Sequence, residues 1–246
     1  EHIVSNNETN EIIDDNGNIF LAKSIIGADS INGVSRKFVI GSDIKSKQKK
    51  IFRAFSFKTS SYQLARNSLQ LIITSIGHFV IYPTIIDKKN ATNYIFVPAD
   101  DKSIPPIIHD KILSYLIPDD INWDTTFATN TNEENNVIHR NGVFLVGDAS
   151  VTMPPHIAQA GNQTLEDTAF IKKCLQENNN FKQMINMFIK HRYIKKKIIS
   201  KKSRSIGKIL SAQKLIGRFR NLSLKAYGNE VLETVLNPIW ASDINE

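Results

Sequence analysis

Two short apolar runs in the sequence each end at a carboxylate. Residues Val143–Val146 are continuously apolar and lead into Gly147–Asp148. Ser24–Ile26 is a similar run, and it leads into Gly27-Ala28-Asp29. Runs of this length that are bounded by turn residues predict buried strands. We therefore expect two buried strands with a carboxylate at the tip of each, and ligands bind outside the carboxyl ends of strands in open α/β sheets.

A helix is predicted directly after the second of these runs. The prolines of Thr152–Pro155 cannot continue a strand, so the chain must turn there. Asn162–Leu175 then carries apolar residues at helical spacing, with Glu166–Asp167 in its first turn, where the macrodipole favours negative charge. A strand, a carboxylate, a rigid loop and a helix N-terminus together suit a ligand with hydroxyls and a developing negative charge. An ordinary strand–loop–helix connection is the alternative.

The remaining apolar and polar pattern predicts a hairpin, a second sheet and one more helix. Asn16–Gly17 is a turn signal between Ile12–Ile13 and Ile19–Ala22, which predicts a hairpin near the start of the chain. A helix is expected over Pro105–Ile117, and the polar residues Asn130–Asn136 indicate a loop after it. Four β-branched and aromatic runs predict the strands of the second sheet: Ile51–Phe57, Leu69–Thr74, Phe79–Tyr82 and Tyr94–Val97.

The C-terminal part of the sequence is helical and basic. Phe181–Leu210 reads as one or two helices. The expected apolar face contains Phe188, His191, Ile194, Ile198 and Ile206, and the expected polar face contains Lys195, Lys196, Lys197, Lys201 and Lys202. A lysine face of this kind is usually solvated, although it could engage a membrane surface weakly. No aromatic residues alternate with the lysines to stack on bases, so no nucleic-acid partner is expected.

Composition excludes several classes of protein. The 246 residues are 41% hydrophobic and 22% charged, with a formal net charge of +7, as in a globular protein with a sizeable core. The sole cysteine, Cys174, fits a reducing compartment such as the cytoplasm, and we expect a buried thiol. The six histidines form no pair at metal-ligand spacing, so no metal is expected. The first residue is Glu1 and not Met, so the chain is expected to begin inside something longer or to have been trimmed.

The order of residues from Gly147 to Asp167 is more specific than any of these patterns. It reads G-D-A-S-V-T-M-P-P-x-x-A-Q-A-G-N-x-x-x-E-D. This resembles the second flavin-binding motif of FAD-dependent aromatic hydroxylases, the class A flavoprotein monooxygenases of p-hydroxybenzoate and salicylate hydroxylase type, whose usual pattern is G-D-A-A-H-x-x-x-P-x-x-G-Q-G-x-N-x-x-x-E-D. The sequence departs from that pattern at Val151, where the family usually has His, and at Ala158 and Ala160, where it usually has Gly.

Two further segments resemble the same family in the same chain order. Gly27 to Arg36 is similar to the family's G-A-D-G-x-x-S-x-V-R, in which the Asp lies near the FAD pyrophosphate. Gly77 to Pro83 is similar to a segment of the sheet domain that holds the substrate, which makes His78 and Tyr82 candidate substrate contacts. A buried or surface His and a packing Tyr are the more ordinary interpretation of those two residues. His156, in the loop of the flavin motif, is a third candidate substrate contact.

The resemblance implies an α/β fold with a mixed sheet and a division into four segments. Residues 1–37 and 137–175 would form parts of a Rossmann-like FAD/NAD(P)-binding domain, 38–136 an inserted antiparallel-sheet substrate domain, and 176–246 a C-terminal helical region. No G-x-G-x-x-G follows a strand in the chain, so the first βαβ unit of the cofactor domain is missing from it. The chain is therefore similar to the carboxyl two-thirds of a family member. The implied cofactor-binding residues are Asp29, Arg36, Gly147, Asp148, Pro155, Gln159, Ala160, Gly161 and Asn162.

The activity implied by the resemblance is hydroxylation of a small aromatic or similar substrate. It would use FAD, NADH or NADPH as co-substrate, and O2, through a flavin hydroperoxide. Because the flavin carries this chemistry, no catalytic side chain is expected in the chain. Asp148 would bind the ribityl chain, Pro155 would shape the loop beside the isoalloxazine, and amides near Gly161 would face its pyrimidine edge. Two alternatives stay open: a related flavoprotein reductase or halogenase, and a non-catalytic remnant that does not bind FAD alone.

Overall fold

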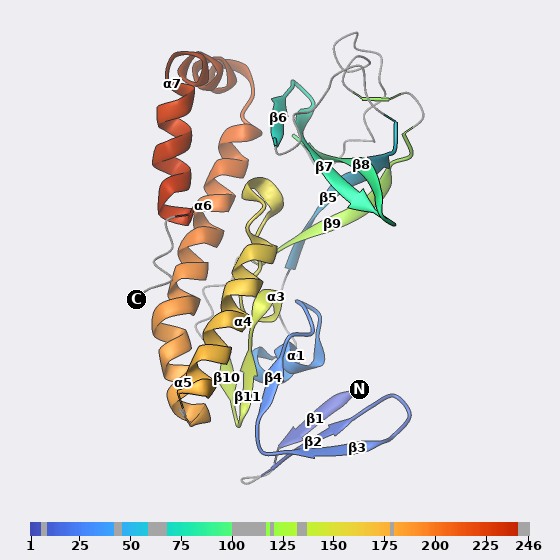
Figure 1. The fold of residues 1–246 in the computed structure, drawn as a ribbon, viewed down its shortest axis with the longest axis vertical. Coiled ribbons are helices and arrows are strands. Elements are labelled where there is room, and N and C mark those ends of the chain that lie inside the picture. Colours follow the sequence, from blue (N-terminus) through green and yellow to red (C-terminus); the bar gives the residue numbers. More distant parts are fainter. Residues whose placement is uncertain are drawn as a thin grey trace. The chain divides into compact units, whose positions relative to one another are not determined.

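The computed structural model describes residues 1–5, 9–41, 46–58, 68–99, 117–118, 121–131, 137–177 and 180–240 (Figure 1). The chain divides into two compact units. The first comprises Glu1–Gln48 and Thr129–Ile206, and the second comprises Lys49–Ala128 and Gly207–Glu246. The predicted helix over Pro105–Ile117 lies almost wholly outside the described residues.

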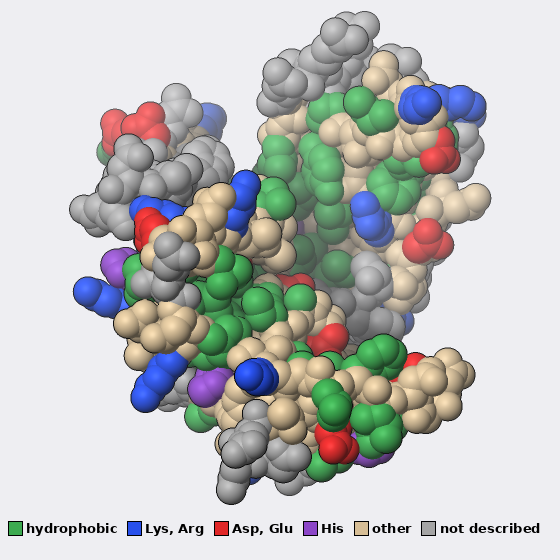
Figure 2. Space-filling model, turned by 60° about the horizontal axis from the view of Figure 1, so that its bottom comes forward, with side chains coloured by type: hydrophobic (Ala, Val, Ile, Leu, Met, Phe, Trp, Pro, Cys, Tyr) green, Lys and Arg blue, Asp and Glu red, His purple; other side chains and the backbone are tan. Residues whose placement is uncertain are grey.

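The first unit contains two small sheets. The sheet of order β1-β2-β3 is formed by His2–Ser5, Asn10–Ile13 and Ile19–Ala22, all antiparallel. The predicted hairpin is confirmed, because Ile13 pairs with Ile19 and Gly17 adopts a positive φ of 81° in the turn. The pattern did not reveal β1. Apolar side chains lie on the surface at this end of the unit (Figure 2), and Ile19, Phe20 and Leu21 are more than half exposed.

The second sheet of this unit is mixed, as predicted. Its order is β10-β11-β4, formed by His139–Arg140, Val143–Leu145 and Ile25–Gly27. β10 and β11 are antiparallel, whereas β11 and β4 are parallel, with Leu145 opposite Gly27. The two apolar runs that end at carboxylates are therefore neighbours, although the paired residues Gly27 and Leu145 are 118 positions apart along the chain.

Helices pack around this mixed sheet. They are α1 (Val34–Ile40), the short α3 (Gly147–Ser150), a 3-10 turn (Pro155–Ile157), α4 (Ala160–Gln176), α5 (Phe181–Phe188), a π-helical turn (Ile189–Tyr193) and α6 (Ile194–Leu210). Phe144 of β11 packs edge-on against Phe188, with ring centroids 4.9 Å apart. Cys174 is buried in the same core, as expected. Each such side chain contributes about 1.5–3 kcal/mol when it leaves water.

The second unit is built on a five-stranded sheet of order β6-β7-β8-β5-β9. These strands are Gln70–Ile73, Gly77–Ile86, Lys89–Pro98, Ser46–Ser56 and Asp124–Thr131. The β6-β7, β7-β8 and β8-β5 pairings are antiparallel, and Phe79 stacks on Phe96 with centroids 4.7 Å apart. β7 and β8 are longer than predicted because Asp87 and Lys88 form a tight turn with positive φ. The unit also contains the end of α6 and α7 (Lys214–Trp240), which has non-helical dihedrals at Tyr227.

The C-terminal helices are divided between the two compact units, with residues up to Ile206 in the first and Gly207–Glu246 in the second. The reason is that α5 and the π-helical turn bury Met184, Ile185, Phe188 and Tyr193 in the core of the first unit. The division of the chain into four segments stays a prediction. Within the described residues, no helix is both long and apolar enough to cross a membrane.

Candidate functional site

The parallel pairing of β4 and β11 places Asp29 and Asp148 after the same ends of neighbouring strands. Asp148 lies in α3, one residue after Gly147, and its side chain is exposed. Gly147 has a φ of +55°, a left-handed conformation that disfavours any residue with a Cβ. The turn therefore depends on a glycine that positions the carboxylate at the tip of the strand.

Asp29 supports the start of α1. Its side chain accepts hydrogen bonds from the Ser35 amide, at 2.8 Å, and from the Ser35 hydroxyl. A Cβ on Gly33 would overlap the Asp29 carboxyl group, so this close approach requires glycine there. Asp29 thus already has two donors within the chain, although its side chain is exposed. Arg36 is buried and donates to the Ala149 carbonyl, so it ties α1 to the turn that carries Asp148.

The other predicted cofactor residues lie on the loop after α3 and on the first turn of α4. Pro155 begins the 3-10 turn, and Gln159 is buried directly before α4. Ala158, where the related motif has Gly, adopts a φ of +51°, so the left-handed conformation is kept without glycine. Gly161 and Asn162 are exposed in the first turn of α4. Apart from the adjoining residues of the same helix, no atom lies within 4 Å of a Cβ built on Gly161. Amides of a first helical turn have no partner inside the helix.

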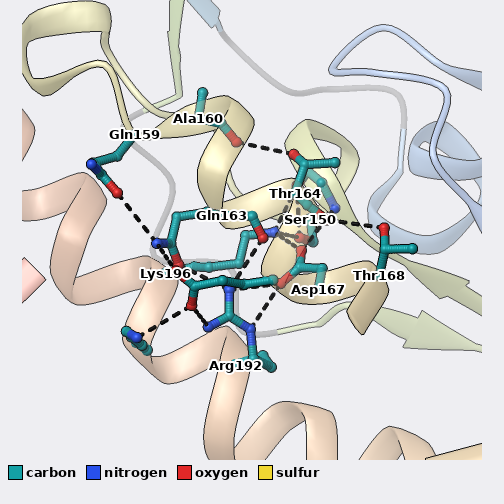
Figure 3. A network of polar contacts seen from close by, with 12 residues as sticks. Ser150, Gln159, Ala160, Gln163, Thr164, Asp167, Thr168, Arg192 and Lys196 are labelled. Atoms are coloured by element: carbon teal, nitrogen blue, oxygen red, sulfur yellow. Dashed lines mark hydrogen bonds and ion pairs between the residues drawn. The ribbon is translucent and has the colours of Figure 1, made fainter. Parts of the chain in front are cut away.

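Sequence reasoning missed the buried polar network behind this turn. Lys196 of α6 is 1% exposed, and its ammonium donates to Asp167 Oδ2 at 2.6 Å, Ser150 Oγ at 2.8 Å and the Gly147 carbonyl at 3.0 Å (Figure 3). These three acceptors match its three N–H donors. Asp167 Oδ2 also accepts from the Gly147 amide at 3.2 Å. Both polar groups of the Gly147 backbone are therefore held by a buried ion pair.

Arg192 extends the network along α4. It donates to Asp167 Oδ1 at 3.2 Å, to Gln163 Oε1 at 2.9 Å and to the Glu166 carboxylate (Figure 3). The prediction that Glu166 and Asp167 occupy the first turn of their helix was wrong, because α4 begins at Ala160. Asp167 is 1% exposed, so its charge is stabilised by buried cations and not by the helix macrodipole.

The predicted faces of the basic helix were also wrong. Ile194 and Ile198 are about half exposed, whereas Lys196 and Ser203 are buried. The π-helical turn at Ile189–Tyr193 inserts an extra residue, which rotates the following face relative to a regular α-helix. A signal was present in the sequence, because polar residues recur at helical spacing along one stripe of this segment: Arg192, Lys196, Ser200 and Ser203.

The two serines of that stripe hold the loop between α3 and the 3-10 turn. Ser200 Oγ donates to the Thr152 carbonyl at 2.6 Å, and Ser203 Oγ donates to the Pro154 carbonyl at 2.7 Å. All four side chains of the stripe thus bond to the segment from Gly147 to Asp167 that resembles the flavin motif. The helix positions the whole loop.

The buried charges also act on Asp148. Partial desolvation raises the pKa of the Asp148 carboxyl above its ordinary value, and the Lys196 ammonium opposes that rise. Desolvation lowers the pKa of Lys196, and the Asp167 carboxylate opposes that change. Lys196 therefore favours the ionised form of the one exposed carboxylate at this turn.

The three candidate substrate residues do not share one unit. His156 is half-buried in the 3-10 turn of the first unit. His78 and Tyr82 lie on β7 of the second unit, where His78 is fully buried and Tyr82 is half-buried. Among the described residues, no group of three or more His, Cys, Asp or Glu side chains is arranged to hold a metal ion.

Comparison with solved structures shows which fold these elements form. The chain is similar to 2,6-dihydroxypyridine-3-hydroxylase from Arthrobacter nicotinovorans, with a TM-score of 0.65 and 15% identity over 85% of this chain and 63% of that chain. It is similar to Klebsiella pneumoniae HpxO complexed with FAD and uric acid, with a TM-score of 0.69 and 13% identity over 96% of this chain and 66% of that chain. It is also similar to a salicylate hydroxylase substrate complex, with a TM-score of 0.68 and 18% identity over 98% of this chain and 67% of that chain.

The chain therefore has the fold of FAD-dependent aromatic hydroxylases, as the sequence resemblance predicted, and it spans about two thirds of their length. No protein-family model matches the sequence, and no curated protein sequence matches it. At identities of 13–18% the likeness establishes the fold alone.

Proposed function

We propose that the protein carrying this chain binds FAD and uses it, with NADH or NADPH and O2, to hydroxylate a small aromatic or similar organic substrate. The observation that carries the proposal is the arrangement at Gly147–Asp148. Asp148 is an exposed carboxylate at the end of a parallel strand, and the residue before it, Gly147, is hydrogen-bonded to the buried Asp167 of α4. The structural neighbours, HpxO with bound FAD among them, support this proposal through their fold.

The residues present fit a flavin. Asp148 is a hydrogen-bond acceptor that suits the hydroxyls of a ribityl chain. The open space at Gly161 leaves the first-turn amides of α4 approachable, and amides at a helix N-terminus favour a group that develops negative charge. Pro155 restricts the loop between them. The Asp29 carboxylate already accepts hydrogen bonds from Ser35. We therefore assign Asp29 a role in stabilising α1 and, through that helix, an indirect role toward the cofactor.

The flavin, when bound, would supply the redox chemistry. The tasks left to the chain are binding, orientation and a fixed electrostatic environment. Lys196 and Asp167 keep the Gly147 turn in one conformation, and Ser200 and Ser203 fix the following loop. His156, and His78 and Tyr82 of the second unit, remain the candidate substrate contacts.

The experiment that tests this proposal measures FAD affinity with and without the Asp148 carboxylate. Loss of one charge-assisted hydrogen bond costs about 1.5–3 kcal/mol, so Asp148→Ala is expected to weaken FAD binding roughly ten- to hundredfold. Glu177→Ala is the matched control, because Glu177 is exposed just beyond the opposite end of α4. Binding is followed by the fluorescence of FAD in the protein that carries this chain.

The outcome separates the cofactor role from a structural one. If Asp148 only stabilised the turn, its loss would lower apo-protein stability by about 1 kcal/mol and leave FAD affinity unchanged. That result would remove Asp148 from the proposed site. A failure to bind FAD at all would contradict the proposal as a whole.

A further inference from the structure

The first part of α7, in the second unit, is basic, and residues 214–229 include no Asp or Glu. Between Glu177 and Glu230 the sequence has fourteen Lys and Arg residues and no Asp or Glu. In the first part of α7 the side chains of Lys214, Arg218 and Lys225 are exposed. Because these positions are four and seven residues apart, they form one basic stripe along the helix.

An apolar stripe lies next to the basic one. Leu215, Phe219 and Leu222 are four and three residues apart, so they also lie along one face of the helix. Leu215 directly follows Lys214 and Phe219 directly follows Arg218, so the two stripes are neighbours. They are 67%, 69% and 64% exposed, and Ile216 beside them is 70% exposed. Isolated exposed apolar side chains are common on protein surfaces, but a continuous stripe of large ones marks an interaction site.

The opposite face of α7 is fixed by contacts within the same unit. Arg220 donates from Nη1 to the carbonyls of Ile209, Leu210 and Ala212 at 3.1, 2.7 and 3.0 Å, and so caps the end of α6. Gly217 is buried, and a Cβ there would lie 2.8 Å from the Ala212 carbonyl oxygen. These contacts determine which side of α7 faces outward, before the helix changes direction at Tyr227 (Figure 1).

We propose that this outward face of α7 docks on an anionic lipid membrane, with the helix lying in the plane of the surface. Leu215, Phe219 and Leu222 would enter the boundary between headgroups and acyl chains, and the adjacent basic stripe would contact acidic headgroups. The proposal is independent of flavin binding. The sequence suggested a weak membrane contact for the lysines of α6, and the proposal assigns the contact to α7 instead.

Two other partners fit the surface less well. A nucleic acid would contact the basic stripe but would leave large aliphatic side chains such as Leu215 and Ile216 without stacking or polar partners. A second copy of the chain could cover the apolar stripe, but it would offer the basic stripe no partner of opposite charge. An anionic bilayer satisfies both stripes at once.

The test is sedimentation of the 246-residue chain with lipid vesicles, either phosphatidylcholine alone or phosphatidylcholine mixed with phosphatidylserine. The wild type is expected to sediment with the phosphatidylserine vesicles, to be released by salt, and to stay in solution with phosphatidylcholine. Replacing all three basic residues (Lys214→Gln, Arg218→Gln, Lys225→Gln) is expected to weaken binding about a hundredfold, at about 1 kcal/mol per residue near the surface. Phe219→Glu is expected to weaken it at least as much, since the apolar stripe can no longer insert.

Matched controls come from the sheet of the same unit. Ile85→Glu changes a side chain as exposed as Phe219, and the triple change Lys58→Gln, Lys88→Gln and Lys89→Gln removes the same charge. Both controls should bind as the wild type does. Phe219→Trp gives a second readout that does not depend on a disruptive change: its fluorescence should shift to shorter wavelength with phosphatidylserine vesicles only.

Several results would overturn the proposal. They are an absence of vesicle binding, equal binding to neutral vesicles, an equal loss in the control variants, or no fluorescence shift in Phe219→Trp. A dimer in light scattering that Phe219→Glu dissociates, without vesicle binding by the wild type, would assign the surface to a second copy instead.

Discussion

The ammonium of Lys196 lies 2.6 Å from Asp167 Oδ2, and both side chains are 1% exposed. The two residues are 29 positions apart and lie on different helices, α6 and α4. Between them they bind the amide and the carbonyl of Gly147, the residue before Asp148. The geometry of the candidate site is therefore set by a pair of charges that never reaches the surface.

Removal of Lys196 is expected to destabilise the fold strongly. In Lys196→Met the buried Asp167 carboxylate loses one of its two cationic partners and keeps only Arg192. Breaking a buried pair in this way costs about 3 kcal/mol or more. Lys195→Met is the control, because Lys195 pairs with the more accessible Glu166 and its loss should cost about 1 kcal/mol or less. Urea unfolding measures both. Adding Asp167→Asn to Lys196→Met should recover part of the loss, and equal costs for the two lysines would contradict the role assigned to Lys196.

Because the pKa of Asp148 is raised, replacing its carboxyl with a neutral group should stabilise the FAD-free protein, by an amount that depends on pH. A carboxyl whose pKa is higher in the folded than in the unfolded chain destabilises the fold when both states are ionised, and this cost disappears below the unfolded pKa of about 3.9. Asp148→Asn should therefore raise the free energy of unfolding at pH 7. Because the side chain is exposed, the gain should be about 0.5 kcal/mol or less. Urea titrations should show this gain shrinking as the pH falls through the raised pKa of Asp148, and a gain that does not change with pH would contradict the assignment.

The serine bonds from α6 are expected to hold the loop beside the candidate site. Ser200→Ala and Ser203→Ala each remove a buried hydroxyl that satisfies a loop carbonyl, at a cost of about 1–3 kcal/mol. Ser205→Ala is the control, since Ser205 is exposed and bonds within its own helix. Hydrogen exchange at the amides of residues 151–153 should quicken in the first two variants and stay unchanged in the third. No change in any variant would show that the loop is held by other contacts.

The turn between β7 and β8 should accept glycine with a gain in stability. Lys88 adopts a φ of +63°, which costs a residue with a Cβ about 1 kcal/mol. Lys88→Gly relieves that strain, and the added freedom of the unfolded chain offsets part of the gain, so an increase of a few tenths of a kcal/mol is expected. Lys89→Gly, one residue later in β8, should instead lower the melting temperature. A loss of stability in both variants would contradict the strain argument.

The chain of residues 1–246 taken alone is expected not to retain FAD tightly. Its sequence has no G-x-G-x-x-G motif, and in dinucleotide-binding folds the βαβ unit with that motif supplies most contacts to the pyrophosphate. The purified chain should therefore be colourless or lose its yellow colour on gel filtration. Stoichiometric flavin after that step, measured by absorbance, would show that residues 1–246 suffice for tight binding.

Local sequence was enough to predict the elements that run through contiguous residues. The runs before Asp29 and Asp148 are strands, Asn16–Gly17 is a hairpin turn, and a helix follows Pro155. These predictions succeeded because turn residues and apolar periodicity act over a few neighbouring positions. The hairpin at Asp87–Lys88 escaped prediction because its left-handed residues are not glycines, so the turn carries no local signal.

Tertiary structure alone decided which polar residues are buried. Lys196 and Asp167 look like solvated charges in the sequence, and only the packing of α6 on α4 shows that each compensates the other away from water. The π-helical turn before Ile194 also changes the buried face of α6, and periodicity counted at 3.6 residues per turn has no means of detecting one inserted residue. The sequence by itself thus determined the strands, the turns and the loop that resembles a flavin motif. The long-range pairing of buried charges, which depends on contacts between distant segments, determined how that loop is held.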